Sequence, residues 1–171
     1  MKFLLWIKRG ETMIKKAARI MEKIQVTFGV IFLSLFFLVI VIQMFARYTG
    51  ISLIWTEEAA NYSFIWSVFM GASVMIHREG HFRFTMFFNK LTGKAKSILI
   101  IFINTILLIF SIALIYYGII ATQNFWNYNW FSIQSFKMGY MFISIPIMGI
   151  SMSVYMIDHI YDAYKEMKRC E

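Results

Sequence analysis

Ionisable residues gather at both edges of one long apolar segment of this chain, and their types could support chemistry. One edge carries Arg47 together with the neighbouring pair Glu57 and Glu58. The other edge carries a basic cluster made of His77, Arg78, His81 and Arg83. Ionisable groups beside hydrocarbon are costly, so each group needs either a partner or a function. Glutamates in such a place could bind a coupling cation or a proton, or could pair with the arginine.

Pairing is the interpretation that the sequence favours for the glutamates. Glu57 and Glu58 lie near the end of the apolar segment, whereas the coupling sites of transporters lie near the middle of the membrane. An ion pair of Arg47 with Glu58 would join the ends of two consecutive apolar segments. Negative charge in the first turns of a helix also complements the helix dipole. We therefore expect a structural clasp here, and ion coupling remains the alternative.

The histidines do not follow a pattern expected of an enzyme or a haem protein. His77, His81 and His159 lie at the boundaries of apolar segments, whereas haem in a helical bundle requires facing histidines within the hydrocarbon. No carboxylate completes a metal site with His77 and His81, and contact with lipid headgroups is the favoured role. The sequence has no HExxH motif, phosphate-binding glycine loop or nucleophile elbow. We expect no catalytic residue, no metal ion and no cofactor.

The composition requires a membrane. The chain has 171 residues, of which 60% are hydrophobic, and its mean hydropathy is +0.64. A soluble domain of this size could not bury so much apolar surface in one core. Four segments are long enough to cross a bilayer, at about 25–46, 55–76, 97–122 and 139–157. The sequence therefore predicts an all-α integral membrane protein with four transmembrane helices in a single domain, residues 1–171.

The basic residues alternate between the two sides of these segments. Of the 17 lysines and arginines, fifteen fall in the two terminal regions and in the loop between the second and third segments. This is the positive-inside pattern, which places both termini in the cytoplasm. The net charge of +8 therefore sets topology and favours the lipid bilayer as a partner, and it does not indicate binding to nucleic acid.

Two further segments have the pattern of helices that lie on a membrane surface. Residues 1–24 alternate basic and apolar groups, which is typical of an amphipathic helix lying on the inner leaflet before the chain turns into the bilayer. The segment from His77 to Lys96 mixes basic and aromatic residues and predicts a second interfacial helix. The aromatic segment 123–137 fits an interfacial belt or, alternatively, a docking surface for a partner outside the membrane. Pro146 should kink the last helix.

Small residues recur every fourth position on the second apolar segment. They are Ala59, Ser63, Ser67 and Gly71. This spacing places them on one helical face, where another helix can approach closely. The pattern predicts a packing groove but does not say whether the helix that fills it belongs to this chain or to another protein.

The same region resembles a known family. The residues that carry the resemblance are Arg47, Tyr48, Trp55, Glu57, Glu58, Trp66, Gly71, Ala72, Arg78 and His81. They resemble the hairpin signature of the small membrane subunit of tripartite ATP-independent periplasmic (TRAP) transporters, the DctQ type. The length, the four apolar segments and the proline in the last segment are also similar to that family.

This resemblance implies a division of labour in the bacterial inner membrane. A soluble periplasmic binding protein would capture an organic acid, such as a dicarboxylate or sialic acid. A large permease subunit would import it by a sodium-driven elevator movement. The present chain would then be the non-catalytic small subunit that scaffolds the large one, and Trp55 would join the clasp and the groove as a packing residue.

Two alternatives remain open from the sequence. The first is an autonomous small transporter that couples ions through Glu57 or Glu58. The second is a membrane anchor of a redox complex, which would require a bound haem or quinone.

Overall fold

The computed structural model describes residues 2–78 and 94–169, with side chains from residue 13 to 78 and from 95 to 168. Its helices are α1 (Lys2–Tyr48), α2 (Ile54–His77), α4 (Lys94–Phe125), α5 (Gly139–Phe142) and α6 (Ser144–Arg169). The described residues contain four helices that are long and apolar enough to cross a membrane. The prediction of an all-α membrane protein is therefore confirmed. The predicted interfacial helix from His77 to Lys96 lies mainly outside the described residues.

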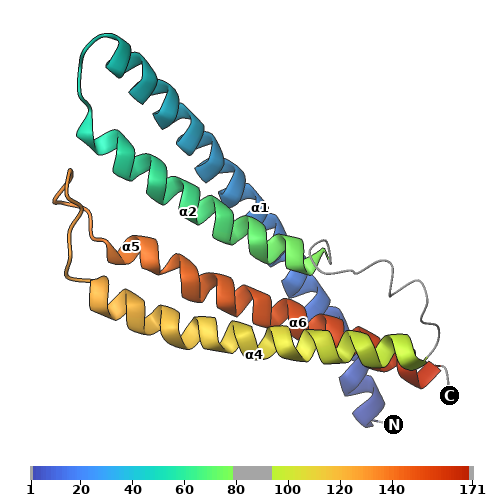
Figure 1. The fold of residues 1–171 in the computed structure, drawn as a ribbon. Helices are drawn as coiled ribbons and strands as arrows, with labels where there is room; N and C mark the ends of the chain where they lie inside the picture. The colour runs from blue at the N-terminus through green and yellow to red at the C-terminus, as the bar shows by residue number, and fades with distance from the viewer. Residues whose placement is uncertain (1, 79–93, 170–171) are drawn as a thin grey trace.

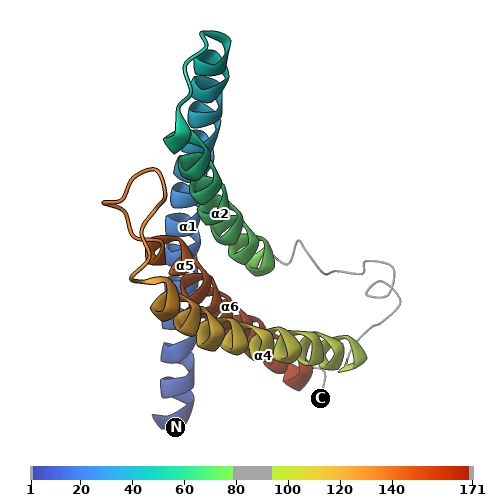
Figure 2. The same cartoon turned by 60° about the vertical axis from the view of Figure 1, so that its left-hand side comes forward.

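The four long helices form two antiparallel hairpins (Figure 1). Helix α1 packs along α2, and α4 packs along α6, while contact between the hairpins is made chiefly by α2 against α6. Figure 2 shows that the hairpins diverge, and that both chain termini lie at the same end. Because each long helix contacts few others, large apolar faces remain exposed, as at Phe45 on α1 and Phe102 on α4.

The predicted break between a surface helix and the first transmembrane helix is wrong. Helix α1 runs without interruption from Lys2 to Tyr48. Its first half contacts α6: Ala18 is buried in a cluster with Tyr155 and Met156, and the Lys15 Nζ lies 2.8 Å from an Asp162 carboxylate oxygen. These contacts stabilise a straight continuation, since the same alternation of apolar and basic residues that suits a membrane surface also suits packing against another helix.

The last transmembrane segment is interrupted at Ile143, three residues before Pro146, while the predicted kink stays a prediction. Helix α5 ends at Phe142 and α6 begins at Ser144. Proline lacks an N–H donor, and its ring would clash with the carbonyl group of the residue four positions earlier, which here is Phe142. Helix α4 accommodates the proline ring at Gly118, where an added Cβ would lie only 2.8 Å from the Pro146 Cδ.

Helices α4 and α6 also approach closely where Gly149 faces α4. A Cβ atom at Gly149 would lie 2.8 Å from the Ile115 Cγ1 and 2.9 Å from the backbone oxygen of Ser111. Beside this contact the hydroxyl groups of Ser111 and Ser153 are hydrogen-bonded at 2.8 Å. A small residue and a hydroxyl pair thus join the two helices in the way common in membrane proteins.

Replacing Gly149 with alanine should destabilise the α4–α6 hairpin. Overpacking costs about 1–3 kcal/mol, which exceeds the gain of at most about 1 kcal/mol from removing a glycine from a helix. Thermal unfolding in detergent should therefore give a lower Tm for Gly149→Ala. Gly71→Ala is the matched control, because its Cβ would meet nothing within 4 Å and its Tm should stay the same or rise. Equal changes in both variants would contradict the close approach.

Candidate functional site

Glu58 fixes the loop between α4 and α5 to the start of α2. We call residues 126–138 the outer loop. The Glu58 carboxylate accepts hydrogen bonds from the backbone N–H groups of Phe131 and Ser132, each at 2.9 Å, and from the Ser132 hydroxyl. Within the loop, the backbone N–H of Trp130 donates a hydrogen bond to the Phe136 carbonyl group at 2.8 Å. A carboxylate that accepts several charge-assisted hydrogen bonds is a strong tether.

The predicted ion pair of Arg47 with Glu58 does not form among the described residues. Both carboxylate oxygens of Glu58 are instead satisfied by the outer loop. Arg47 is exposed in the last turn of α1, and Glu57 is also exposed. The α1–α2 connection is set by its turn, in which Gly50 adopts a positive φ of 76° that other residues rarely take. Trp55, at the start of α2, is 38% exposed.

The face of small residues on α2 is only partly covered. Ser63 is buried, Ala59 and Ser67 are half-buried, and Gly71 is exposed. Near Ser67, α1 approaches closely at Gly29, whose added Cβ would lie 3.4 Å from the Met70 Cβ. The packing groove is thus used within this chain along one part, while the Gly71 end is open.

Trp66, a residue of the family signature, links three helices. Its indole ring stacks on Phe32 of α1 with the ring centroids 5.3 Å apart. Its Nε1 donates a hydrogen bond to the Tyr140 carbonyl group of α5 at 3.1 Å. Trp66 is half-buried, and its N–H is satisfied by this hydrogen bond. Trp66 therefore supplements Glu58 as a connection between the two hairpins.

The opposite ends of the hairpins are joined by a second polar cluster. The His77 ring stacks on Tyr155 with the centroids 4.3 Å apart, and the His159 Nε2 lies 3.0 Å from the His77 carbonyl oxygen. Glu22 accepts a hydrogen bond from the Arg78 Nε at 2.6 Å. His77 and His159 therefore contact neighbouring helices, and their predicted contact with lipid headgroups stays a prediction. His81 and Arg83 lie outside the described residues.

Sequence reasoning missed the partners in this cluster. The buried Tyr155 hydroxyl donates to the Gln25 side-chain oxygen at 2.7 Å, and Gln25 is itself 3% exposed. The available signal was Glu22, an acidic residue in an N-terminal region that is otherwise mainly basic. A single acidic residue among basic ones is a candidate for an ion pair.

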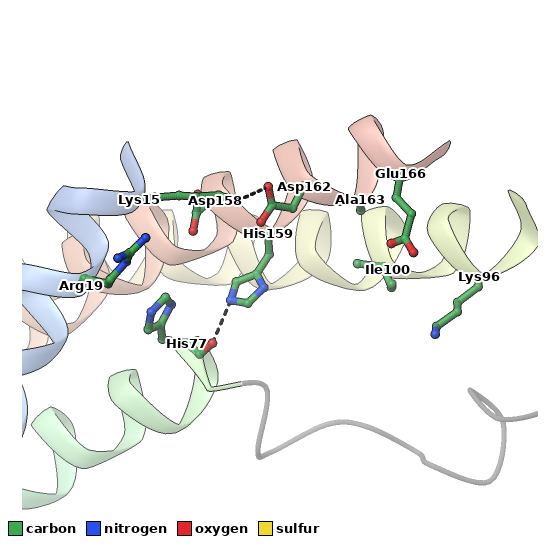
Figure 3. A pocket seen from close by; sticks show the side chains of 10 residues that line it. All are labelled: Lys15, Arg19, His77, Lys96, Ile100, Asp158, His159, Asp162, Ala163 and Glu166. Atoms are coloured by element: carbon green, nitrogen blue, oxygen red, sulfur yellow. Dashed lines mark hydrogen bonds and ion pairs between the residues drawn. The ribbon is translucent and has the colours of Figure 1, made fainter. Parts of the chain in front are cut away.

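A cavity of about 510 Å³ opens beside this cluster and is lined by residues of α1, α2, α4 and α6. We call it the terminal cavity because it lies at the end that carries both termini (Figure 3). Six charged residues line it: Lys15, Arg19, Lys96, Asp158, Asp162 and Glu166. The described residues contain no group of three or more His, Cys, Asp or Glu side chains placed to hold a metal ion.

Glu58→Gln should loosen the outer loop. Hydrogen bonds to a charged group contribute about 1.5–3 kcal/mol, so the loss should raise the exchange rates of the Phe131 and Ser132 amide hydrogens by roughly tenfold or more. Hydrogen exchange with mass spectrometry of the protein in detergent would measure this. Glu57→Gln, which removes an exposed neighbouring charge, should leave these rates unchanged. Similar exchange in all three proteins would show that Glu58 is not the tether.

Tyr155→Phe should destabilise the protein, because it leaves the buried Gln25 oxygen unpaired. The expected cost is about 1–3 kcal/mol, and replacing both partners with apolar groups should recover much of it. The Gln25 Nε2 already lacks a partner among the described residues. Unfolding by SDS would compare Tyr155→Phe, Gln25→Leu and the double variant. If the loss of stability in the double variant equalled the sum of the losses in the two single variants, the pairing would be contradicted, since the effects of independent sites are additive.

Comparison with known proteins agrees with this architecture. Residues 36–166 match a family model described as tripartite ATP-independent periplasmic transporters, DctQ component. The chain is also 28% identical over 114 residues to the sialic acid TRAP transporter small permease protein SiaQ of Vibrio cholerae, a match that covers 66% of this chain and 64% of that protein. The aligned part therefore spans less than two thirds of that relative's length. Because the family match extends from the last third of α1 almost to the end of α6, the chain belongs to the DctQ component family of TRAP transporters.

Proposed function

We propose that this chain is the non-catalytic small subunit of a sodium-coupled TRAP importer in the bacterial inner membrane, where it scaffolds a large, elevator-type permease subunit. A periplasmic substrate-binding protein would deliver an organic acid to that complex. Membership of the DctQ family supports the subunit role. The similarity to a sialic acid transporter subunit supports an organic acid as the cargo, because sialic acid carries a carboxylate.

The observation that carries this proposal is the distribution of charge along the helices. The segments 25–46, 59–76, 97–122 and 139–157 contain no charged residue. Ionisable residues inside membranes mark substrate and ion pathways, so these segments lack the usual groups of a transport site. Their exposed apolar faces, as at Phe37 on α1 and Phe110 on α4, fit lipid and a second membrane subunit.

The basic residues support an orientation with both termini in the cytoplasm. In this orientation the outer loop and Glu58 face the periplasm. The loop presents Phe131, which is 86% exposed, and Tyr128, which is 60% exposed. Exposed aromatic side chains on a tethered loop are suited to contact with another protein. Arg47, exposed at the same end, is available to a partner subunit in the same way.

Affinity purification of this chain in mild detergent from its native membrane tests the proposal. A stoichiometric membrane protein with ten or more apolar spans should co-purify. A second experiment reconstitutes the purified protein into liposomes. Liposomes that contain this chain alone should not take up an organic acid. A stable homo-oligomer that transports alone, with activity lost in Glu58→Gln, would instead establish an autonomous ion-coupled transporter.

Glu58→Gln and Arg47→Ala should impair uptake by the complete system without changing which substrate it accepts. Loss of the outer-loop tether, or of an exposed partner contact, should lower the yield of the co-purified complex and the uptake rate by roughly fivefold or more. Uptake assays with competing carboxylates would measure both rate and preference. A shift in substrate preference would contradict the scaffold role, because it would place these residues at the substrate.

A further inference from the structure

Helix α2 is the least apolar of the four described spans, and yet most of it is not covered by this chain. Its most apolar stretch of 18 residues has a mean hydropathy of 1.3, whereas that of α4 reaches 3.0. In α6, where the value is 1.7, 44% of the stretch is buried, but in α2 only 28% is buried. Helix faces in contact with lipid are usually strongly apolar, as those of α4 are. The uncovered part of α2 therefore suits contact with protein better than contact with lipid.

The exposed residues of α2 from Glu57 to Met75 all lie on one face. They follow one another at intervals of four and three residues in turn, which is the seven-residue repeat of helices that pack side by side with a left-handed crossing. Helices α1 and α6 contact α2 elsewhere, and because the hairpins diverge (Figure 2), neither covers this face. We call it the open face of α2, and it consists of Glu57, Asn61, Phe64, Val68, Gly71 and Met75.

Asn61 places an amide group on the open face, where lipid tails cannot satisfy it. The Asn61 side chain is exposed and forms no hydrogen bond with another described residue. It lies about one helical turn, roughly 6 Å, closer to the middle of the membrane than Glu57. An amide without a partner in hydrocarbon is unfavourable, and asparagine side chains form hydrogen bonds between neighbouring transmembrane helices. The open face therefore fits a helix that offers a polar group at this level.

Gly71 allows a neighbouring helix to come near the open face. A Cβ atom added at Gly71 would meet nothing within 4 Å, so packing within this chain does not require a glycine there. Glycine weakens the interior of a helix, whereas in membranes it lets two helix backbones approach closely. Gly71 thus gives the open face a low point between Val68 and Met75, which are 46% and 40% exposed.

The charge at the outer end of the open face argues against a second copy of this chain as the cover. Two copies in one membrane would have the same orientation, and a symmetric pair brings the same residues together. Glu57 would then face the Glu57 of the other copy, and like charges repel. The face instead fits a helix with a cationic group opposite Glu57 and a hydrogen-bonding side chain opposite Asn61.

We propose that the open face of α2 is the docking surface for a transmembrane helix of the large permease subunit. This inference rests on the proposed function, in which such a subunit exists. It assigns the two surfaces of the protein to different neighbours: the open face of α2 binds the subunit, and the exposed face of α4 that carries Phe102 and Phe110 contacts lipid.

Photo-crosslinking in the native membrane tests the assignment. The photoreactive residue p-benzoyl-phenylalanine would replace Phe64 on the open face, which is 44% exposed, or Phe110 on α4, which is 54% exposed and is the matched control. The residue at position 64 should crosslink to the membrane protein of ten or more spans that co-purifies with this chain. The residue at position 110 should not crosslink to that protein.

Two substitutions separate docking from folding. Gly71→Leu should lower the yield of the co-purified complex, because it fills the point of closest approach, while the Tm of the chain alone should not fall. Asn61→Leu should lower the yield about threefold or more through the lost hydrogen bond. Ser34→Leu is the control, because Ser34 is a small exposed residue of α1 outside the open face, and the yield should stay unchanged.

The outcomes distinguish this inference from the proposed function. If the large protein co-purified but was crosslinked from position 110 and not from position 64, the subunit role would stand and the open face would be wrong as its site. Normal complex yield in both Gly71→Leu and Asn61→Leu would overturn the inference in the same way. A crosslink from position 64 to a second copy of this chain would replace the large subunit as the occupant. If no large membrane protein co-purified, both proposals would fail.

Discussion

The membrane allows this chain to place charge only outside its apolar segments, and the rest of the structure depends on that constraint. A charged side chain at the middle of a bilayer costs about 2.5–3.5 kcal/mol or more. Both polar clusters accordingly lie at the ends of apolar segments. Glu58 tethers the outer loop at one end, and Glu22 bonds Arg78 beside His77 and Tyr155 at the other. Between them, the hairpins are held by apolar contacts and by short hydroxyl and indole hydrogen bonds.

The number and approximate position of the transmembrane helices could be predicted because hydrophobic length is a local property of the sequence. The predicted kink at Pro146 has the same basis, since the missing N–H group belongs to the residue itself. The continuity of α1 was not predictable. A stretch with alternating basic and apolar residues suits a membrane surface and a helix interface equally. Only the contact of Ala18 with Tyr155, distant in sequence, decides between them.

The role of Glu58 could be anticipated, but its partner could not. Arg47 is close in the sequence and carries the opposite charge, so side-chain reasoning selects it. The true donors are two backbone N–H groups and a serine hydroxyl, 73 and 74 residues away. Every residue except proline has a backbone N–H, so a sequence gives no sign of which ones will face a carboxylate. The hydrogen bond between Gln25 and Tyr155 could not be predicted for a related reason, because the burial of both residues depends on how the hairpins cross.

The proposed scaffold role depends on the depth of the protein in the bilayer. A scaffold for an elevator movement must keep its position while the moving part slides past it, and apolar faces alone set depth only weakly. Polar attachments at both interfaces set it more strongly. The outer loop held by Glu58 presents aromatic groups at one interface, where such residues anchor membrane proteins. At the other interface, the stacking of His77 on Tyr155 joins the two hairpins to each other.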